Sequence, residues 1–156
     1  MVSRIPALIH LAGVVLFLGN FVAAWLVYAR ARRTRDAAAL AGLFGLVNAG
    51  DRWLMPVSVI AIVAGGAWAA RLQGLSITGT GWIIWSFVAL GVSGVVFLAR
   101  LHGLQLRLES AATRGGLAPA DYGEMLASWA WWTVAGTAPV LLAFGLMVLR
   151  PNLPGF

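Results

Sequence analysis

Four long apolar runs separate the few charged residues of this chain, and they restrict its fold more than any other feature. Each run is close to the roughly 20 residues that an α-helix needs to cross about 30 Å of hydrocarbon. Backbone polar groups in lipid must be paired within their own segment, so each run is expected to be helical. The sequence therefore predicts an all-α, polytopic membrane protein, a four-transmembrane-helix bundle forming a single transmembrane domain over residues 1–156. The expected spans are residues 5–28, 54–71, 81–101 and 125–149.

The composition agrees with this class and excludes several kinds of chemistry. Hydrophobic residues make up 61% of the chain and charged residues only 10%, unlike a soluble domain. There is no cysteine, which excludes disulfides, thiolate metal sites and covalently attached c-type haem. The formal charge of +6 comes from arginines that cluster beside the apolar runs. We expect these arginines to face anionic lipid of the bilayer, and we expect no nucleic-acid partner.

The arginines also predict the orientation of the chain. Residues 29–53 and 100–124 hold eight of them, whereas only Arg4, Arg71 and Arg150 lie elsewhere. Positive charge favours the cytoplasmic side, so both termini are expected on the outer side. Because every basic residue is arginine, as in GC-rich bacteria, the expected location is a bacterial cytoplasmic (inner) membrane. The first run is too long for the apolar part of a cleaved signal and is expected to be retained.

A short amphipathic helix is expected after the first span. Leu40, Leu43, Phe44 and Val47 recur at helical spacing. Asp36 precedes them as a start signal, and residues 48–50, Asn-Ala-Gly, follow as a stop signal. This pattern predicts a separate helix lying at the membrane interface.

His10 is the first candidate functional residue. It is an ionisable group inside the first apolar run, where such groups are expensive and usually functional. At 100° per residue, His10 shares a helix face with Gly13 and Asn20. His10 and Asn20 are therefore expected to face the same interior, roughly 15 Å apart along the helix.

Counting from the outer ends of the spans places four further residues at the level of His10: Gly65, Gly66, Trp85 and Ser86. A histidine facing two glycines and an aromatic ring could accommodate a flat macrocycle, so His10 is a candidate metal ligand in a haem b site. Two alternatives stay open. The imidazole could be a neutral group that joins helices through a bond to Ser86 or a backbone carbonyl, or it could transfer protons.

A second polar cluster is expected at the cytoplasmic edge. Its members would form an ion-pair and hydrogen-bond network, or else a solvated belt that anchors the interface. They are Tyr28, Asp51, Arg52, His102 and Glu124. His10 and His102 should not hold one haem together, because their depths differ by on the order of 20 Å. Most of the eight tryptophans are expected to be interfacial anchors.

Two stretches resemble a family of uncharacterised bacterial integral membrane proteins. The first is residues 8–20, LIHLAGVVLFLGN, and the second is residues 51–56, DRWLMP, followed by Gly65. More distantly, the His10 helix resembles that of membrane-bound protoporphyrinogen oxidases with b-type haem, and of copper-resistance-type membrane domains. The resemblance to the oxidases implies a haem role for His10. The apolar run at residues 22–25 and the absence of lysine depart from that family and argue against the oxidase activity.

Three functions therefore compete. The first is a small redox module in which His10 is an axial ligand of haem b. The second is a non-enzymatic accessory or scaffold subunit, with a membrane protein partner or a second copy of the chain. The third is a small permease, for which four short spans leave little room. No catalytic motif is present, so the sequence leaves open whether the protein is an enzyme.

Overall fold

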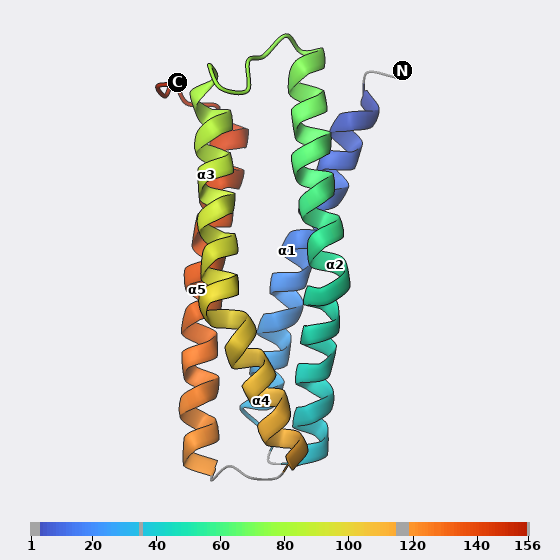
Figure 1. Cartoon of the computed structure of the whole chain (residues 1–156), viewed down its shortest axis with the longest axis vertical. Helices are drawn as coiled ribbons and strands as arrows, with labels where there is room; N and C mark the ends of the chain where they lie inside the picture. Colours follow the sequence, from blue (N-terminus) through green and yellow to red (C-terminus); the bar gives the residue numbers. More distant parts are fainter. Residues whose placement is uncertain (1–3, 35, 115–118, 156) are drawn as a thin grey trace.

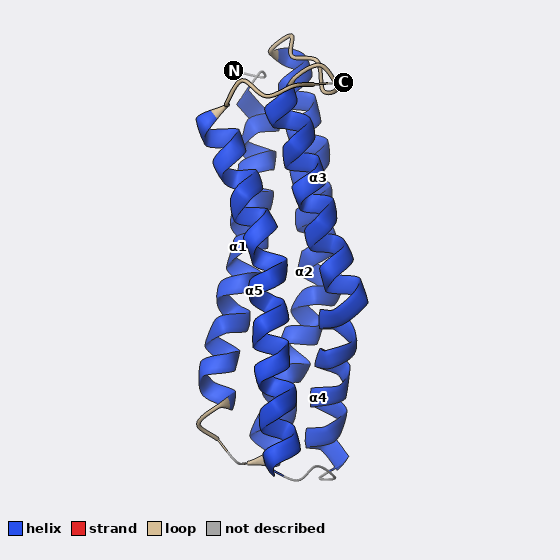
Figure 2. Cartoon of the chain, turned by 90° about the vertical axis from the view of Figure 1, so that its left-hand side faces the viewer, coloured by secondary structure: helices blue, strands red, loops and turns tan. Residues whose placement is uncertain are grey.

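The computed structural model of the chain describes residues 4–34, 36–114 and 119–155, with the backbone alone at 119 and 120. Within these residues, all regular structure is helical (Figure 2). Four helical stretches are long and apolar enough to cross a membrane, which confirms the predicted four-helix bundle. The helices are α1 (Ile5–Ala31), α2 (Ala37–Leu72), α3 (Gly81–Val96), the π-helix η2 (Phe97–Leu101), α4 (His102–Arg114) and α5 (Pro119–Leu149).

The bundle consists of two closely packed helix pairs. α1 packs mainly against α2, and α3 packs mainly against α5, with few contacts between α1 and α5. Figure 1 shows the two pairs side by side, with the start of α1 and the end of α5 at the same end of the bundle. We call this the terminal end, and the end that holds α4 the α4 end.

Glycines bring α1 and α2 into close contact near the terminal end. A Cβ atom at Gly13 would lie 2.9 Å from the carbonyl oxygen of Ser58 and from the amide nitrogen of Ile62. At Gly65, a Cβ would lie 2.8 Å from the amide nitrogen of His10. Small residues at such crossings let the backbones of membrane helices approach, so these glycines place His10 directly against α2.

The expected interfacial helix is not a separate element. Residues 40–47 form the first turns of α2, which is a single helix of 36 residues. Asp36 caps its start, as expected, by accepting a hydrogen bond from the amide of Ala38 at 3.0 Å. The helix continues through the expected stop signal at residues 48–50 because these residues contact neighbouring helices. Tertiary packing here outweighs the roughly 1 kcal/mol by which glycine disfavours a helix interior.

The segment between the expected third and fourth spans is also largely helical among its described residues. η2 follows α3 directly and continues into α4, so the chain stays helical to Arg114. A π-helix interrupts the regular hydrogen-bond ladder, and such interruptions change the direction of a helix. Figure 1 shows the result: α3 runs beside α5, whereas α4 crosses over to α2.

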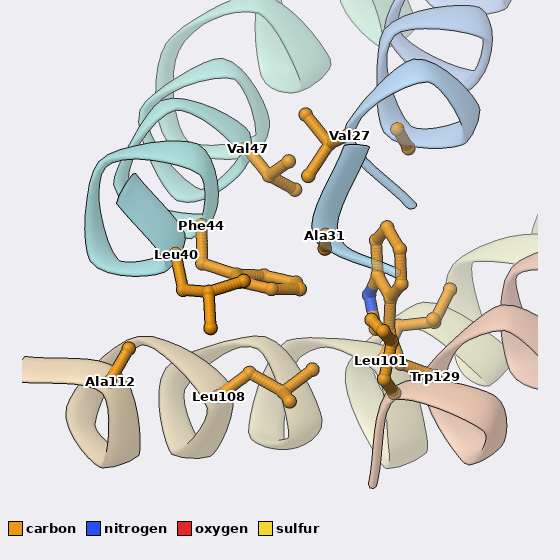
Figure 3. Packing of buried hydrophobic residues seen from close by; sticks show 11 residues of the cluster. Val27, Ala31, Leu40, Phe44, Val47, Leu101, Leu108, Ala112 and Trp129 are labelled. Carbon is orange, nitrogen blue, oxygen red and sulfur yellow. The ribbon is translucent and has the colours of Figure 1, made fainter. Parts of the chain in front are cut away.

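This crossing closes a hydrophobic core at the α4 end. Figure 3 shows Phe44 of α2, Leu108 of α4 and Trp129 of α5 meeting with the end of α1. Phe44 and Leu108 are fully buried, and Trp129 is 1% exposed. Trp129 is therefore a core residue and is not one of the tryptophans that anchor the interface. Its ring packs edge-on against Phe44, with centroids 5.4 Å apart.

Candidate functional site

A cavity of about 310 Å³ lies between the two helix pairs towards the terminal end. Residues of α1, α2, α3 and α5 line it, and most of their side chains are apolar. Phe17, Leu90 and Val140 belong both to its lining and to a second hydrophobic cluster, which closes the cavity towards the middle of the bundle. The lining residues with polar groups are His10, Gln73, Trp82, Ser86 and Arg150.

A single hydrogen bond defines the tautomer of His10. Its Nδ1 lies 2.8 Å from the backbone carbonyl oxygen of Ile62 on α2. A carbonyl oxygen only accepts hydrogen bonds, so Nδ1 carries the proton and donates it. In a neutral imidazole, Nε2 is then the nitrogen with a free lone pair. This bond selects the tautomer that can bind a metal through Nε2.

Gly66 provides the room in which this histidine lies. A Cβ at this position would be 2.8 Å from Nδ1 of His10 and 3.1 Å from its Cε1. The sequence placed His10 at the level of Gly65 and Gly66, and the structure brings all three together. Gly13, one turn along α1, holds the same helix pair together but does not line the cavity.

Ser86 and Trp85 are arranged differently from each other. Ser86 lines the cavity, and its hydroxyl is directed at the carbonyl oxygens of Trp82, at 2.7 Å, and Ala143, at 3.3 Å. Trp85 is 40% exposed, and its Nε1 donates to the carbonyl of Pro154 at 3.3 Å. Trp85 lies on the face of α3 that is turned away from Ser86 and does not line the cavity. Trp82, one turn before Ser86, is the tryptophan of the cavity.

Asn20 does not face the cavity with His10. Its Nδ2 donates to Oδ1 of Asp51 at 2.6 Å, and its Oδ1 lies over Gly50 of α2. Asn20 therefore belongs to a polar interface of α1, α2 and α4. The sequence did not predict this contact, because it placed Asp51 before the second span and not within a long helix.

The expected cytoplasmic-edge cluster forms only in part. Asp51 has His102 as a neighbour, but His102 is exposed and its ring packs at a tilt against Phe97, with centroids 5.9 Å apart. Arg52 is exposed and stacks over Trp53 at 5.7 Å.

The two remaining members of the expected cluster do not join Asp51. Glu124 is exposed. Tyr28 packs instead against Trp25 and Trp129, with ring centroids 5.6 and 6.5 Å away. Of the five expected members, only Asp51 and His102 therefore lie close together.

The polar interface contains three residues that sequence reasoning missed. Asn48 donates through Nδ2 to Oε2 of Glu109, and Gln105 is a neighbour of Asp51. Asn48 and Asp51 are three residues apart on α2, while Gln105 and Glu109 are four apart on α4. Such spacings put each pair on one helix face. This signal was available, but residues 48–50 and 102–124 were expected to lie outside the membrane spans.

The fold defines the class of the protein: a four-span, all-helical integral membrane protein with an apolar cavity between its helix pairs. Residues 5–151 match the family described as "Predicted integral membrane protein (DUF2269)". The chain belongs to this family, which confirms the predicted membership of an uncharacterised membrane protein family. No curated protein and no solved structure matches the chain. The expected likeness to haem-containing oxidases finds no support in these comparisons.

Proposed function

We propose that this protein is a membrane-embedded binding module whose cavity holds a lipophilic ligand through His10. One observation carries the proposal: Nδ1 of His10 donates to the Ile62 carbonyl at 2.8 Å, which leaves Nε2 free on a residue that lines an apolar cavity. Small-molecule sites are typically apolar clefts with a few well-placed polar groups. The lining of this cavity has that composition.

The ligand that the free Nε2 of His10 favours is b-type haem. Protein ligands of metals are commonly histidines whose second ring nitrogen donates to a carbonyl or carboxylate, which fixes the ring and its tautomer. The Ile62 carbonyl has this role for His10. Haem would supply one-electron redox chemistry when bound, and the chain would supply an axial nitrogen and an apolar environment.

Other lining residues suit such a ligand. Met147 of α5 lines the same cavity, and its thioether is a known second axial ligand of haem iron. Arg150 also lines the cavity, with its guanidinium over the Trp82 ring at 5.4 Å. An arginine there can pair with a carboxylate. The volume of about 310 Å³ is at the lower end for small-molecule sites, so a macrocycle requires side chains such as Met147 to move.

An absorption spectrum tests this proposal. The protein is purified from haem-replete cells in mild detergent, and separately titrated with haemin. We expect a Soret band that is lost in His10→Ala and retained in His102→Ala, the matched control, because His102 is exposed and does not line the cavity. Met147→Leu should change the band position if the thioether is the second ligand.

Two outcomes would overturn the proposal. One is a colourless preparation that also fails to bind haemin. The other is a Soret band that persists equally in His10→Ala and His102→Ala, which would show non-specific haem uptake. A colourless preparation that retains a stoichiometric membrane partner would favour the accessory subunit.

The orientation of the chain belongs to the same proposal. The start of α1 and the end of α5 lie at the same end of the bundle (Figure 1). Most arginines lie towards the α4 end, which the positive-inside rule assigns to the cytoplasm. The cavity then lies in the outer half of a bacterial inner membrane.

A further inference from the structure

The polar interface of α1, α2 and α4 is a second candidate site, separate from the cavity. It contains two carboxylates, Asp51 and Glu109, and the amides of Asn20, Asn48 and Gln105. None of these five residues lines the cavity. Asp51 and Glu109 are both half-buried, and burying carboxylates is costly unless their charge is compensated, so a positive charge here would stabilise the interface.

Oxygen atoms without a hydrogen-bond donor gather in this interface. Among the described residues, Oδ1 of Asn48, Oδ2 of Asp51 and Oε1 of Gln105 are buried and have no partner. Gln105 is the most buried of the three, at 3% exposure, and its side chain lies within hydrogen-bonding reach of Asp51, although its Oε1 has no donor. Buried polar atoms are normally paired, so three unpaired acceptors in one interface indicate a missing positive or hydrogen-bonding group.

The cationic side chains nearby do not fill this role. Arg52 follows Asp51 in sequence but is exposed and stacks over Trp53. His102 is near Asp51, yet it is also exposed. A proton shared between Asp51 and Gln105 would pair only two of the three oxygens. One water has two donors and would bring no charge.

We propose that Asn48, Asp51 and Gln105 bind a hard, oxygen-liganded cation between α2 and α4. Carboxylate and amide oxygens are the ligands that calcium and magnesium ions prefer. The second carboxylate, Glu109, is held beside the site by its bond from Asn48. A cation here compensates the charge of Asp51 and Glu109 and joins the two helices that close the α4 end.

The experiment uses purified full-length protein in detergent, dialysed against EDTA and transferred to choline chloride. Mg²⁺, Ca²⁺ and Na⁺ are then added separately at matched ionic strength, and the thermal midpoint is followed by tryptophan fluorescence. Equilibrium dialysis with elemental analysis measures bound metal on the wild type directly. We expect one of the three ions to raise the midpoint saturably and to bind at one per chain.

Two variants remove ligand oxygens. Gln105→Met deletes the amide oxygen at similar length, and Asp51→Asn removes the carboxylate charge. Each should weaken cation binding by about tenfold or more, a change of roughly 1.4 kcal/mol or more. Glu124→Gln is the matched control because Glu124 is exposed, and it should bind as the wild type does. His10→Ala should also keep cation binding, so this test is independent of the proposed ligand cavity.

The proposal is overturned if none of the three ions binds the wild type or raises its midpoint above choline chloride. It is equally overturned if Gln105→Met and Asp51→Asn bind the ion as tightly as Glu124→Gln. If Asp51→Asn fails to fold, Gln105→Met decides, because that substitution leaves both carboxylates in place.

Discussion

Asn20 of α1 donates a hydrogen bond to Asp51 of α2 across 2.6 Å, although the two residues are 31 positions apart. Along the same helix pair, this bond lies closer to the α4 end than the contacts of Gly13 and His10 do. It gives the α1–α2 pair a polar contact in addition to its close glycine packing. The pair that positions His10 therefore depends on two kinds of contact, and each can be removed separately.

Replacing Asn20 should destabilise the bundle. Asn20→Leu replaces the amide with an apolar side chain of similar size and leaves Oδ1 of Asp51 without its donor. We expect the free energy of unfolding to fall by about 1–3 kcal/mol, because a buried acceptor loses its partner. Denaturation by SDS in mixed micelles, followed by circular dichroism, measures the change. Asn152→Leu, an exposed position, is the control, and equal losses in the two variants would contradict the role of the bond.

Two glycines of α1 should respond oppositely to the same substitution. A Cβ at Gly13 would lie 2.9 Å from Ala61, Ile62 and Ser58 of α2, whereas at Gly19 it would meet nothing within 4 Å. Gly13→Ala should force the helices apart and lower the free energy of unfolding by about 1–3 kcal/mol. Gly19→Ala should raise it by up to roughly 1 kcal/mol through helix propensity. The same denaturation assay compares them, and a stable Gly13→Ala variant would disprove the close crossing.

Gly66→Ala should disturb the cavity more than the fold. The added methyl would lie 2.8 Å from Nδ1 of His10, so the imidazole must move and its bond to Ile62 must lengthen or break. We expect ligand affinity at the cavity to fall by about tenfold or more. A haemin titration measures this change. Gly91→Ala is the control, since nothing lies within 4 Å of its Cβ, and an equal loss there would argue against a positioning role.

Two tryptophans of α5, one buried and one exposed, should differ in how much they stabilise the fold. Trp129 is 1% exposed and Trp131 is 67% exposed. Trp129→Ala should lower the free energy of unfolding by about 3–5 kcal/mol, as expected for a large side chain removed from a core. Trp131→Ala should change it by about 0.5 kcal/mol or less. Similar effects in the two variants would mean that α5 is rotated about its axis relative to the structure described above.

The absence of cysteine makes the orientation directly testable. Single cysteines are placed at Ser76, between α2 and α3, and at Thr113, near the end of α4; both positions are exposed. In spheroplasts, a membrane-impermeant maleimide should label Ser76→Cys at once and Thr113→Cys only after lysis. The reverse pattern would invert the orientation that the arginines predict.

Parts of the site could be derived from helical periodicity alone. Counting turns from the helix ends placed His10 opposite Gly65 and Gly66, and the structure shows these contacts. The same counting placed Trp85 with Ser86, although neighbouring residues point in different directions. Depth along a helix follows from residue number, but the direction of a side chain into a cavity depends on how each helix is rotated against its partners.

The sequence by itself determined the class of the protein, because four apolar runs of membrane-spanning length allow only a helical solution in lipid. It also marked His10 as the ionisable residue within the first run. Only the tertiary structure decided that α2 continues through residues 48–50 and that α4 crosses to it. Helix stop signals are weak local preferences, and contacts such as Asn20–Asp51 and Asn48–Glu109 outweigh them once distant segments pack together.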